Sequence, residues 1–300
     1  GVTMKKSGIS SWFIIAVIIF IITIATGTYE SVTQKYNPQD SIVTALHAYG
    51  YLKEYQVRYE PSKGIWHILG WTGSAFMVTM MLYSVRKRFS MFAHWGALRH
   101  WLSAHIFLGI MGALLVTLHT TFKLGGIVAT SFWSMIITVI FGILGRYIYI
   151  QIPQNVAGTD LQVNEINKMV EEVDNKLRER SGNVDVSPLF KEIDVVDERV
   201  KDLNLFNALY LMVKTDIINR FKLLHINKVL KTEYHLSKGI RKQIVLFMSK
   251  KAALIRRKNF LSTSHRLLRY WHVLHVPLAI VMFIIMFLHV GVYFLLGGGI

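Results

Sequence analysis

Five long apolar runs, none of which contains Asp, Glu, Lys or Arg, limit what this chain of 300 residues can fold into. They cover residues 12–28, 65–85, 101–122, 127–145 and 271–297. A helix needs about 20 apolar residues to cross a bilayer core of roughly 30 Å, and each run approaches or exceeds that length. Hydrophobic residues make up 52% of the chain, which is too much for a soluble domain of this size. We therefore predict an all-α integral membrane protein with five transmembrane helices.

The basic residues between the runs predict an orientation, because cytoplasmic loops carry an excess of Lys and Arg. Lys5 and Lys6 precede the first run, a basic connector at 86–99 follows the second, and Arg146 follows the fourth. These residues share one side if the N-terminus is cytoplasmic, and the segment 29–63 and the C-terminus are then external. We expect residence in a bacterial inner membrane. The first run is longer than the apolar core of a signal peptide, so we expect it to remain as a helix.

A polar block before the fifth run divides the chain into three predicted parts. These are residues 1–153 with four helices, a cytoplasmic helical insertion at 154–269, and the fifth helix at 270–300. The insertion starts with an acidic, amphipathic pattern from Leu161 to Arg180, which predicts a helix, and a second helix is expected before residue 203. Residues 203–269 then hold 15 Lys and Arg against two acidic residues. Such a segment either lies on anionic lipid or binds an acidic partner, and we expect no nucleic-acid binding despite the net charge of +16.

Four of the histidines on the third and fifth apolar runs form two pairs of equal spacing. His105 and His119 are 14 residues apart on the third run, and His275 and His289 are 14 apart on the fifth. Fourteen residues is two heptads, so each pair lies near one helix face with about 21 Å between its members. If the two helices face each other, the imidazoles form two couples, one near each membrane surface. Two axial histidines for each iron suit a b-type haem, so the sequence predicts a bundle with two haem b groups.

Other chemistries fit these residues less well. Ligands about 21 Å apart on one helix cannot share a zinc ion, whose bonds are about 2 Å long. An ion transporter normally needs a carboxylate inside the bundle, and the five runs have none. The absence of Cys excludes a Cys-ligated iron–sulfur cluster, a thiolate-bound haem and c-type haem attachment. The alternative from another class is a non-redox membrane scaffold whose histidines only pack.

Charged residues and glycines near the histidines are further candidates. Arg99 and Arg269 are expected near the cytoplasmic haem, and Lys123 near the external one, because haem propionates need cationic partners. The positive-inside rule explains the two arginines equally well. Gly109 and Gly112, on the run that carries the first pair, either clear a surface for a flat macrocycle or allow close packing of helices.

Two more histidines are ambiguous. His272 lies one turn before His275 and is an alternative ligand, or a contact for a propionate or a quinone; the equal spacing of the pairs favours His275. His67 lies at the external end of the second run, beside Trp66. It is a candidate contact for a quinone or a further haem, or an ordinary interfacial residue.

The two pairs on the third and fifth runs, with a cytoplasmic segment before the fifth, resemble the ferric reductase-like transmembrane domain. That superfamily includes NADPH oxidases and ferric reductases. The resemblance covers residues 65–150 and 270–297, and two features depart from it. A sixth apolar run is absent, and neither 154–269 nor the C-terminal end carries the G-x-G-x-x-G pattern of a nucleotide-binding domain. We therefore do not expect the chain to take hydride from NADPH by itself.

The resemblance implies two stacked b haems, with His105 opposite His275 on the cytoplasmic side and His119 opposite His289 on the external side. It also implies an electron-transfer subunit of a larger membrane oxidoreductase. The expected donors are the quinone pool or a partner subunit, such as an iron–sulfur protein, a flavoprotein or a multihaem cytochrome. A self-contained quinol oxidase or metal reductase is the alternative. The sequence assigns no catalytic side chain and leaves open the donor, the acceptor and the direction of electron flow.

Overall fold

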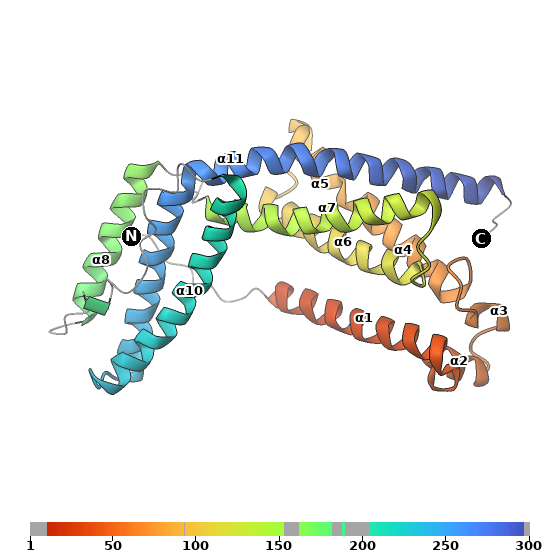
Figure 1. Cartoon of the computed structure of the whole chain (residues 1–300), viewed down its shortest axis with the longest axis horizontal. Coiled ribbons are helices and arrows are strands. Elements are labelled where there is room, and N and C mark those ends of the chain that lie inside the picture. Colours follow the sequence, from red (N-terminus) through yellow and green to blue (C-terminus); the bar gives the residue numbers. More distant parts are fainter. Residues whose placement is uncertain (1–10, 93, 153–161, 182–187, 190–203, 297–300) are drawn as a thin grey trace. The chain divides into compact units, whose positions relative to one another are not determined.

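Five helices in the computed structural model are long and apolar enough to cross a membrane, which confirms the predicted number of spans. The structure describes residues 11–92, 94–152, 162–181, 188–189 and 204–296, and every element in these ranges is a helix. The spans are α1 (Ser11–Tyr36), α4 (Gly64–Met80) continued by α5 (Leu82–Arg88), α6 (Leu98–His119), α7 (Gly126–Gln151) and α11 (Lys238–Leu295) (Figure 1). These five candidate spans indicate that the chain is an integral membrane protein.

The first span is longer than its apolar run. Helix α1 continues to Tyr36, so the first residues of the expected external loop 29–63 are helical. Within this extension the hydroxyls of Ser31 and Thr33 donate to the carbonyls of Gly27 and Tyr29, one turn earlier, so these polar side chains are satisfied within the helix. The rest of the loop forms three short helices: η1 (Pro38–Asp40), α2 (Ile42–Ala48) and α3 (Glu54–Val57). A further short helix, η2 (Ser90–Phe92), lies in the connector between α5 and α6.

The described chain divides into two compact units, each with its own core. The first unit comprises Gly1–Gly142 and His275–Ile300, and the second comprises Ile143–Leu274. Helices α7 and α11 each contribute one end to either unit. The predicted border between insertion and fifth helix, at residue 269, falls inside α11, which is continuous from Lys238 to Leu295 and contains Pro277.

Glycines bring α4 and α6 into close contact in the first unit. A Cβ atom at Gly112 would lie 3.0 Å from the carbonyl oxygen of Gly73, and a Cβ at Gly73 would lie equally close to the carbonyl of Gly112. A Cβ at Gly109 would lie 3.0 Å from the Met80 sulfur. Both glycines of α6 therefore face α4 and serve close helix packing. The expectation that they clear a surface for a macrocycle is wrong, because α4 occupies that side.

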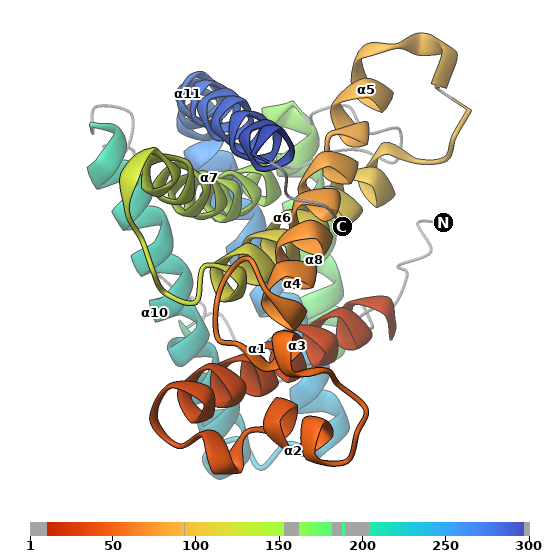
Figure 2. The same ribbon diagram turned by 90° about the vertical axis from the view of Figure 1, so that its right-hand side faces the viewer.

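One apolar core joins four helices of the first unit. It contains Met77 of α4, Ala113 of α6, Phe132 and Met135 of α7, and Met282 and Phe283 of α11. The Ser131 hydroxyl on α7 also donates to the Met282 carbonyl at 3.1 Å. Figure 2 looks along these helices and shows α6 next to both α4 and α7. The third and fifth apolar runs thus share a core. Ala113 lies about midway between His105 and His119, and Met282 lies midway between His275 and His289, so this core is at a level between the two predicted histidine couples.

The second unit is a helical bundle of the insertion. Its elements are α8 (Val163–Ser181), α10 (Leu205–Thr232), the first half of α11 and the end of α7. The predicted acidic helix from Leu161 to Arg180 corresponds closely to α8, whereas the second helix expected before residue 203 lies almost wholly outside the described residues. Apolar side chains from all three long helices form the core, among them Ile166, Leu177, Met212, Ile226, Leu230, Ile244, Met248 and Phe260.

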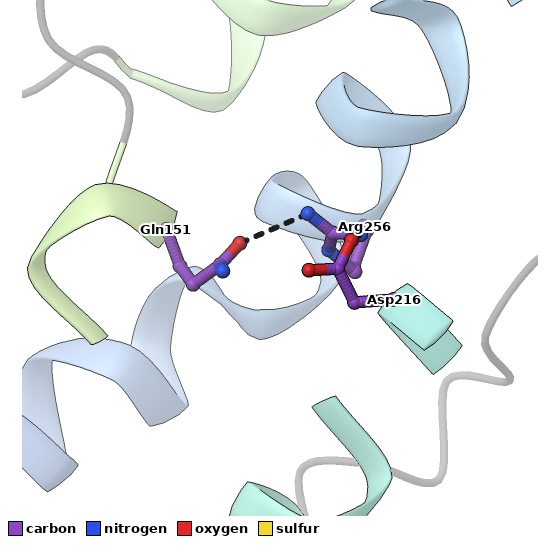
Figure 3. Close-up of polar contacts among 3 residues, drawn as sticks. All are labelled: Gln151, Asp216 and Arg256. Carbon is purple, nitrogen blue, oxygen red and sulfur yellow. Dashed lines mark hydrogen bonds and ion pairs between the residues drawn. The ribbon is translucent and has the colours of Figure 1, made fainter. Parts of the chain in front are cut away.

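Ion pairs cross this bundle between helices. Arg256 of α11 is paired with Asp216 of α10, and its Nη2 donates to Oε1 of Gln151 on α7 at 3.2 Å (Figure 3). Lys251 of α11 is paired with Asp174 of α8. The Arg256 side chain is 10% exposed, so its contacts hold three helices together in a largely buried position.

Candidate functional site

Two histidines of α6, His105 and His119, direct the same ring nitrogen to the backbone of α4. Nδ1 of His105 lies 2.9 Å from the Met80 carbonyl oxygen, and Nδ1 of His119 lies 2.8 Å from the Trp66 carbonyl oxygen. A carbonyl oxygen can only accept, so Nδ1 carries a proton in both rings, and in the neutral form of each ring Nε2 is the nitrogen with a free lone pair. Neutral imidazole binds metals through such a nitrogen, and metal-bound histidines usually donate their other N–H to an acceptor of this kind.

The local structure of α4 makes each carbonyl accessible. At its C-terminal end, α4 is interrupted at Met81. The Met81 carbonyl accepts from the Ser84 amide, and the Met80 carbonyl accepts from His105. Towards the N-terminal end of α4, the lack of a side chain at Gly70 admits the ring of His119, because a Cβ there would lie 2.6 Å from its Nδ1. These two features, a helix break and a glycine, place equivalent contacts at the two ends of α6.

A chain of hydrogen bonds extends from His119 to α1. The Trp66 side chain is 1% exposed, and its Nε1 donates to Oε1 of Gln34 at 3.0 Å. Nε2 of Gln34 donates to Oε1 of Glu30 at 2.9 Å. The buried Glu30 carboxylate also accepts from the Ser41 hydroxyl and from two backbone amides at the start of α2. The C-terminal end of α1 and the start of α2 are therefore tied to the residue that orients His119.

His275 and His289 of α11 lie in the same unit as His105 and His119. His289 interacts electrostatically with His119, which lies at the C-terminal end of α6. His275 is half-buried, and a Cβ at Gly142 of α7 would lie 3.8 Å from its Cε1. The structure thus brings the second predicted couple, His119 and His289, to one end, and places His275 against α7.

His67 belongs to an aromatic cluster at that same end. Its Nε2 accepts a hydrogen bond from Nε1 of Trp71 at 3.1 Å, and its ring centroid lies 5.1 Å from that of Tyr293 on α11. It too lies within electrostatic range of His119. Because Trp71 already engages Nε2, the ring can offer only Nδ1 to a further ligand. Its predicted role as a quinone or haem contact stays a prediction.

The remaining candidates are exposed side chains. Arg99 lies in the first turn of α6 and Lys123 follows its C-terminus, while Arg269 and His272 lie on α11 within the second unit. Their predicted contacts with propionates or a quinone stay predictions. Within the described ranges, no three His, Asp or Glu side chains are grouped so that they could hold a metal ion. A haem iron needs only two protein ligands, so this finding does not bear on the histidine pairs.

Sequence reasoning identified the four histidines but not the groups that orient them. The Trp66 and Met80 carbonyls are backbone acceptors on another helix, and no residue type marks a backbone acceptor. Gly70 was the one available signal, as a glycine one turn after Trp66 in an apolar helix. Comparison with protein-family models, with curated proteins and with solved structures gives no match for this chain.

Proposed function

We propose that this chain is a b-type membrane cytochrome that holds two haems and carries single electrons between the two faces of the membrane. The observation that carries the proposal is the shared geometry of His105 and His119. Each donates Nδ1–H to a carbonyl of α4 and keeps Nε2 unprotonated, which is the state of an iron ligand. A histidine that only packs can satisfy either nitrogen, so the same choice at both ends of α6 favours ligation.

In this proposal His105 pairs with His275 and His119 pairs with His289. The core shared by α6 and α11 supports the pairing of these two helices, and the electrostatic interaction of His289 with His119 supports the second couple. Bound haem supplies reversible one-electron chemistry at its iron. Backbone carbonyls of α4 orient the imidazoles of His105 and His119, and the apolar core around Met282 lies between the two histidine levels. The low dielectric of such a core strengthens every electrostatic interaction with a ligand.

The proposed context is a larger redox complex in a bacterial inner membrane, with the N-terminus cytoplasmic and the C-terminus external. The donor is a quinol or a partner redox subunit, and the acceptor lies on the other face. The cluster of His67, Trp71 and Tyr293 beside His119 favours a quinone at the external end, since aromatic rings and one histidine nitrogen suit such a ring. A self-contained quinol oxidase or metal reductase and a non-redox scaffold are the rival functions.

Haem quantification in purified protein tests the proposal. The unaltered chain should contain two b haems with a reduced-minus-oxidised α-band. Alanine substitution of one ligand should remove one haem and leave the other: His119→Ala or His289→Ala the external haem, His105→Ala or His275→Ala the cytoplasmic one. His94→Ala is the matched control, because this histidine is exposed in the connector and should keep both haems.

Two outcomes would contradict the proposal. A colourless protein from haem-replete cells that is folded by circular dichroism would favour the scaffold. Full haem retention in a ligand variant would remove that residue from the ligand set, and if both haems persist in His275→Ala but one is lost in His272→Ala, the ligand assignment on α11 is reversed.

A further inference from the structure

Helix α10 has two apolar faces, and the bundle buries only one of them. The buried face includes Ala208, Met212, Ile226 and Leu230, all within the core of the second unit. On the opposite face lie five large exposed residues, Phe206, Tyr210, Ile217, Phe221 and Leu224. Figure 1 shows α10 beside the first half of α11, which covers only one side of it.

The exposed residues form one continuous stripe. Their spacing of three, four or seven residues keeps them within about 60° of one another on a helix with 100° per residue. Phe206 is 86% exposed and Leu224 is 67% exposed, so the stripe remains uncovered from one end to the other. An isolated exposed apolar residue is ordinary, but a stripe of five along a helix marks a surface that contacts something apolar.

Positive charge surrounds the stripe. Lys214 lies along one edge and Arg220 along the other, and Lys228 and Lys231 continue it towards the C-terminal end of α10. The helix has one acidic residue, Asp216, and the ion pair with Arg256 already engages its carboxylate (Figure 3). The Lys214 ammonium lies 5.7 Å from the Tyr210 ring centroid, so cations and aromatic rings intermix on this face.

The combination fits a lipid surface better than a partner helix. Helix α10 is not among the five helices that are apolar enough to span a membrane. Its stripe therefore suits the interface between lipid and water and not the hydrocarbon core. Aromatic residues flanked by Lys and Arg are typical of helices that lie in the headgroup region. Helix α11 also runs without a break from this unit into its apolar span, which tethers the stripe to a membrane and raises its effective concentration there.

We propose that this face of α10 docks on the anionic lipid of the membrane that the chain spans. The stripe inserts its aromatic and aliphatic side chains at the level of the headgroups, and Lys214, Arg220 and Lys228 bind lipid phosphates. Docking fixes the second unit against the membrane surface. This inference is independent of the haem proposal, because it rests on α10 alone.

Site-directed spin labelling of the full chain tests this docking. The protein has no Cys, so a single introduced Cys is the only labelling site. The test positions are Ile217→Cys and Phe221→Cys on the stripe, and Glu172→Cys on the exposed side of α8 is the control. Each labelled protein is placed in nanodiscs of phosphatidylcholine with or without phosphatidylglycerol, and accessibility to oxygen and to a nickel chelate gives the depth of the label.

With the anionic lipid, the stripe labels should lie about 5–10 Å below the headgroup surface while the α8 label remains in water. Substitution of Lys214, Arg220 and Lys228 by Gln removes three cations, each of which is attracted to anionic lipid by about 1 kcal/mol. The ratio of docked to undocked protein should therefore fall on the order of a hundredfold. Stripe labels as accessible to the nickel chelate as the control would overturn the proposal. So would equal protection in discs without phosphatidylglycerol, or dipolar coupling between labels in detergent, which would assign the stripe to a second copy.

Discussion

The side chains that join helices in the two units are paired in different ways. In the first unit, the part-buried rings of His105 and His119 donate to neutral backbone carbonyls. In the second, Arg256 and Lys251 meet the carboxylates Asp216 and Asp174. A membrane span cannot hold unpaired charges cheaply, so neutral donors and main-chain acceptors suit it, whereas a bundle outside the span can use ion pairs. The neutral solution leaves one nitrogen of each imidazole unprotonated, and that nitrogen is what a metal needs.

The largest effect on the proposed haem sites should come from Gly70→Ala. The new Cβ would lie 2.6 Å from Nδ1 of His119, so the ring must leave the Trp66 carbonyl. We expect loss of the external haem and destabilisation of about 1–3 kcal/mol from overpacking, measured by haem content and thermal unfolding. Gly291→Ala is the matched control in the same unit, because no atom lies within 4 Å of its Cβ position. Equal haem content in the two variants would show that Gly70 does not set the position of His119.

Removal of one partner from the ion pair should affect the second unit alone. Arg256→Met leaves the Asp216 carboxylate and the Gln151 amide without their partner. Because the pair is largely buried, we expect this bundle to lose about 3 kcal/mol of stability. The rate of amide hydrogen exchange in α10 measures this loss. The double variant Arg256→Met, Asp216→Leu should recover most of the loss. If Arg256→Met also changed the haem spectrum, the expectation that this substitution affects the second unit alone would be wrong.

A smaller effect is expected from Trp66→Phe. This change keeps an aromatic ring and the backbone carbonyl that orients His119, but it removes the hydrogen bond from Nε1 to Gln34. The half-buried amide oxygen of Gln34 then lacks this donor, and loss of the hydrogen bond costs about 1 kcal/mol. Both haems should be retained, with the midpoint potential of the external haem shifted and that of the cytoplasmic haem unchanged. A redox titration measures both, and a shift confined to the cytoplasmic haem would exclude the proposed link.

The smallest effect should come from Lys251→Gln. Its partner Asp174 is 34% exposed, and exposed ion pairs contribute only about 0.2–1 kcal/mol. Thermal unfolding in low and high salt should show a small loss that disappears as salt rises, since ions screen exposed charges. A loss as large as that of Arg256→Met would mean that position in the bundle, and not burial, decides the strength of these pairs.

Local patterns in the sequence predicted the helices well. The five spans follow from apolar runs without charge, and α8 follows from the amphipathic pattern of 161–180. Hydropathy misplaced two helix ends: α1 continues to Tyr36, beyond its apolar run, and α4 is interrupted at Met81 within an unbroken apolar stretch. Helix ends depend on such individual contacts, which hydropathy does not contain.

The sequence by itself determined that this is a helical membrane protein with two histidine pairs at equal helical spacing. Periodicity and hydropathy are local properties, and they survive in any packing of the helices. Only the tertiary structure decided that Gly109 and Gly112 face α4, that the carbonyls of Trp66 and Met80 orient the histidines, and that one apolar face of α10 stays exposed. These facts depend on which helix lies beside which, and a backbone carbonyl or a helix neighbour leaves no mark on the residue that will meet it.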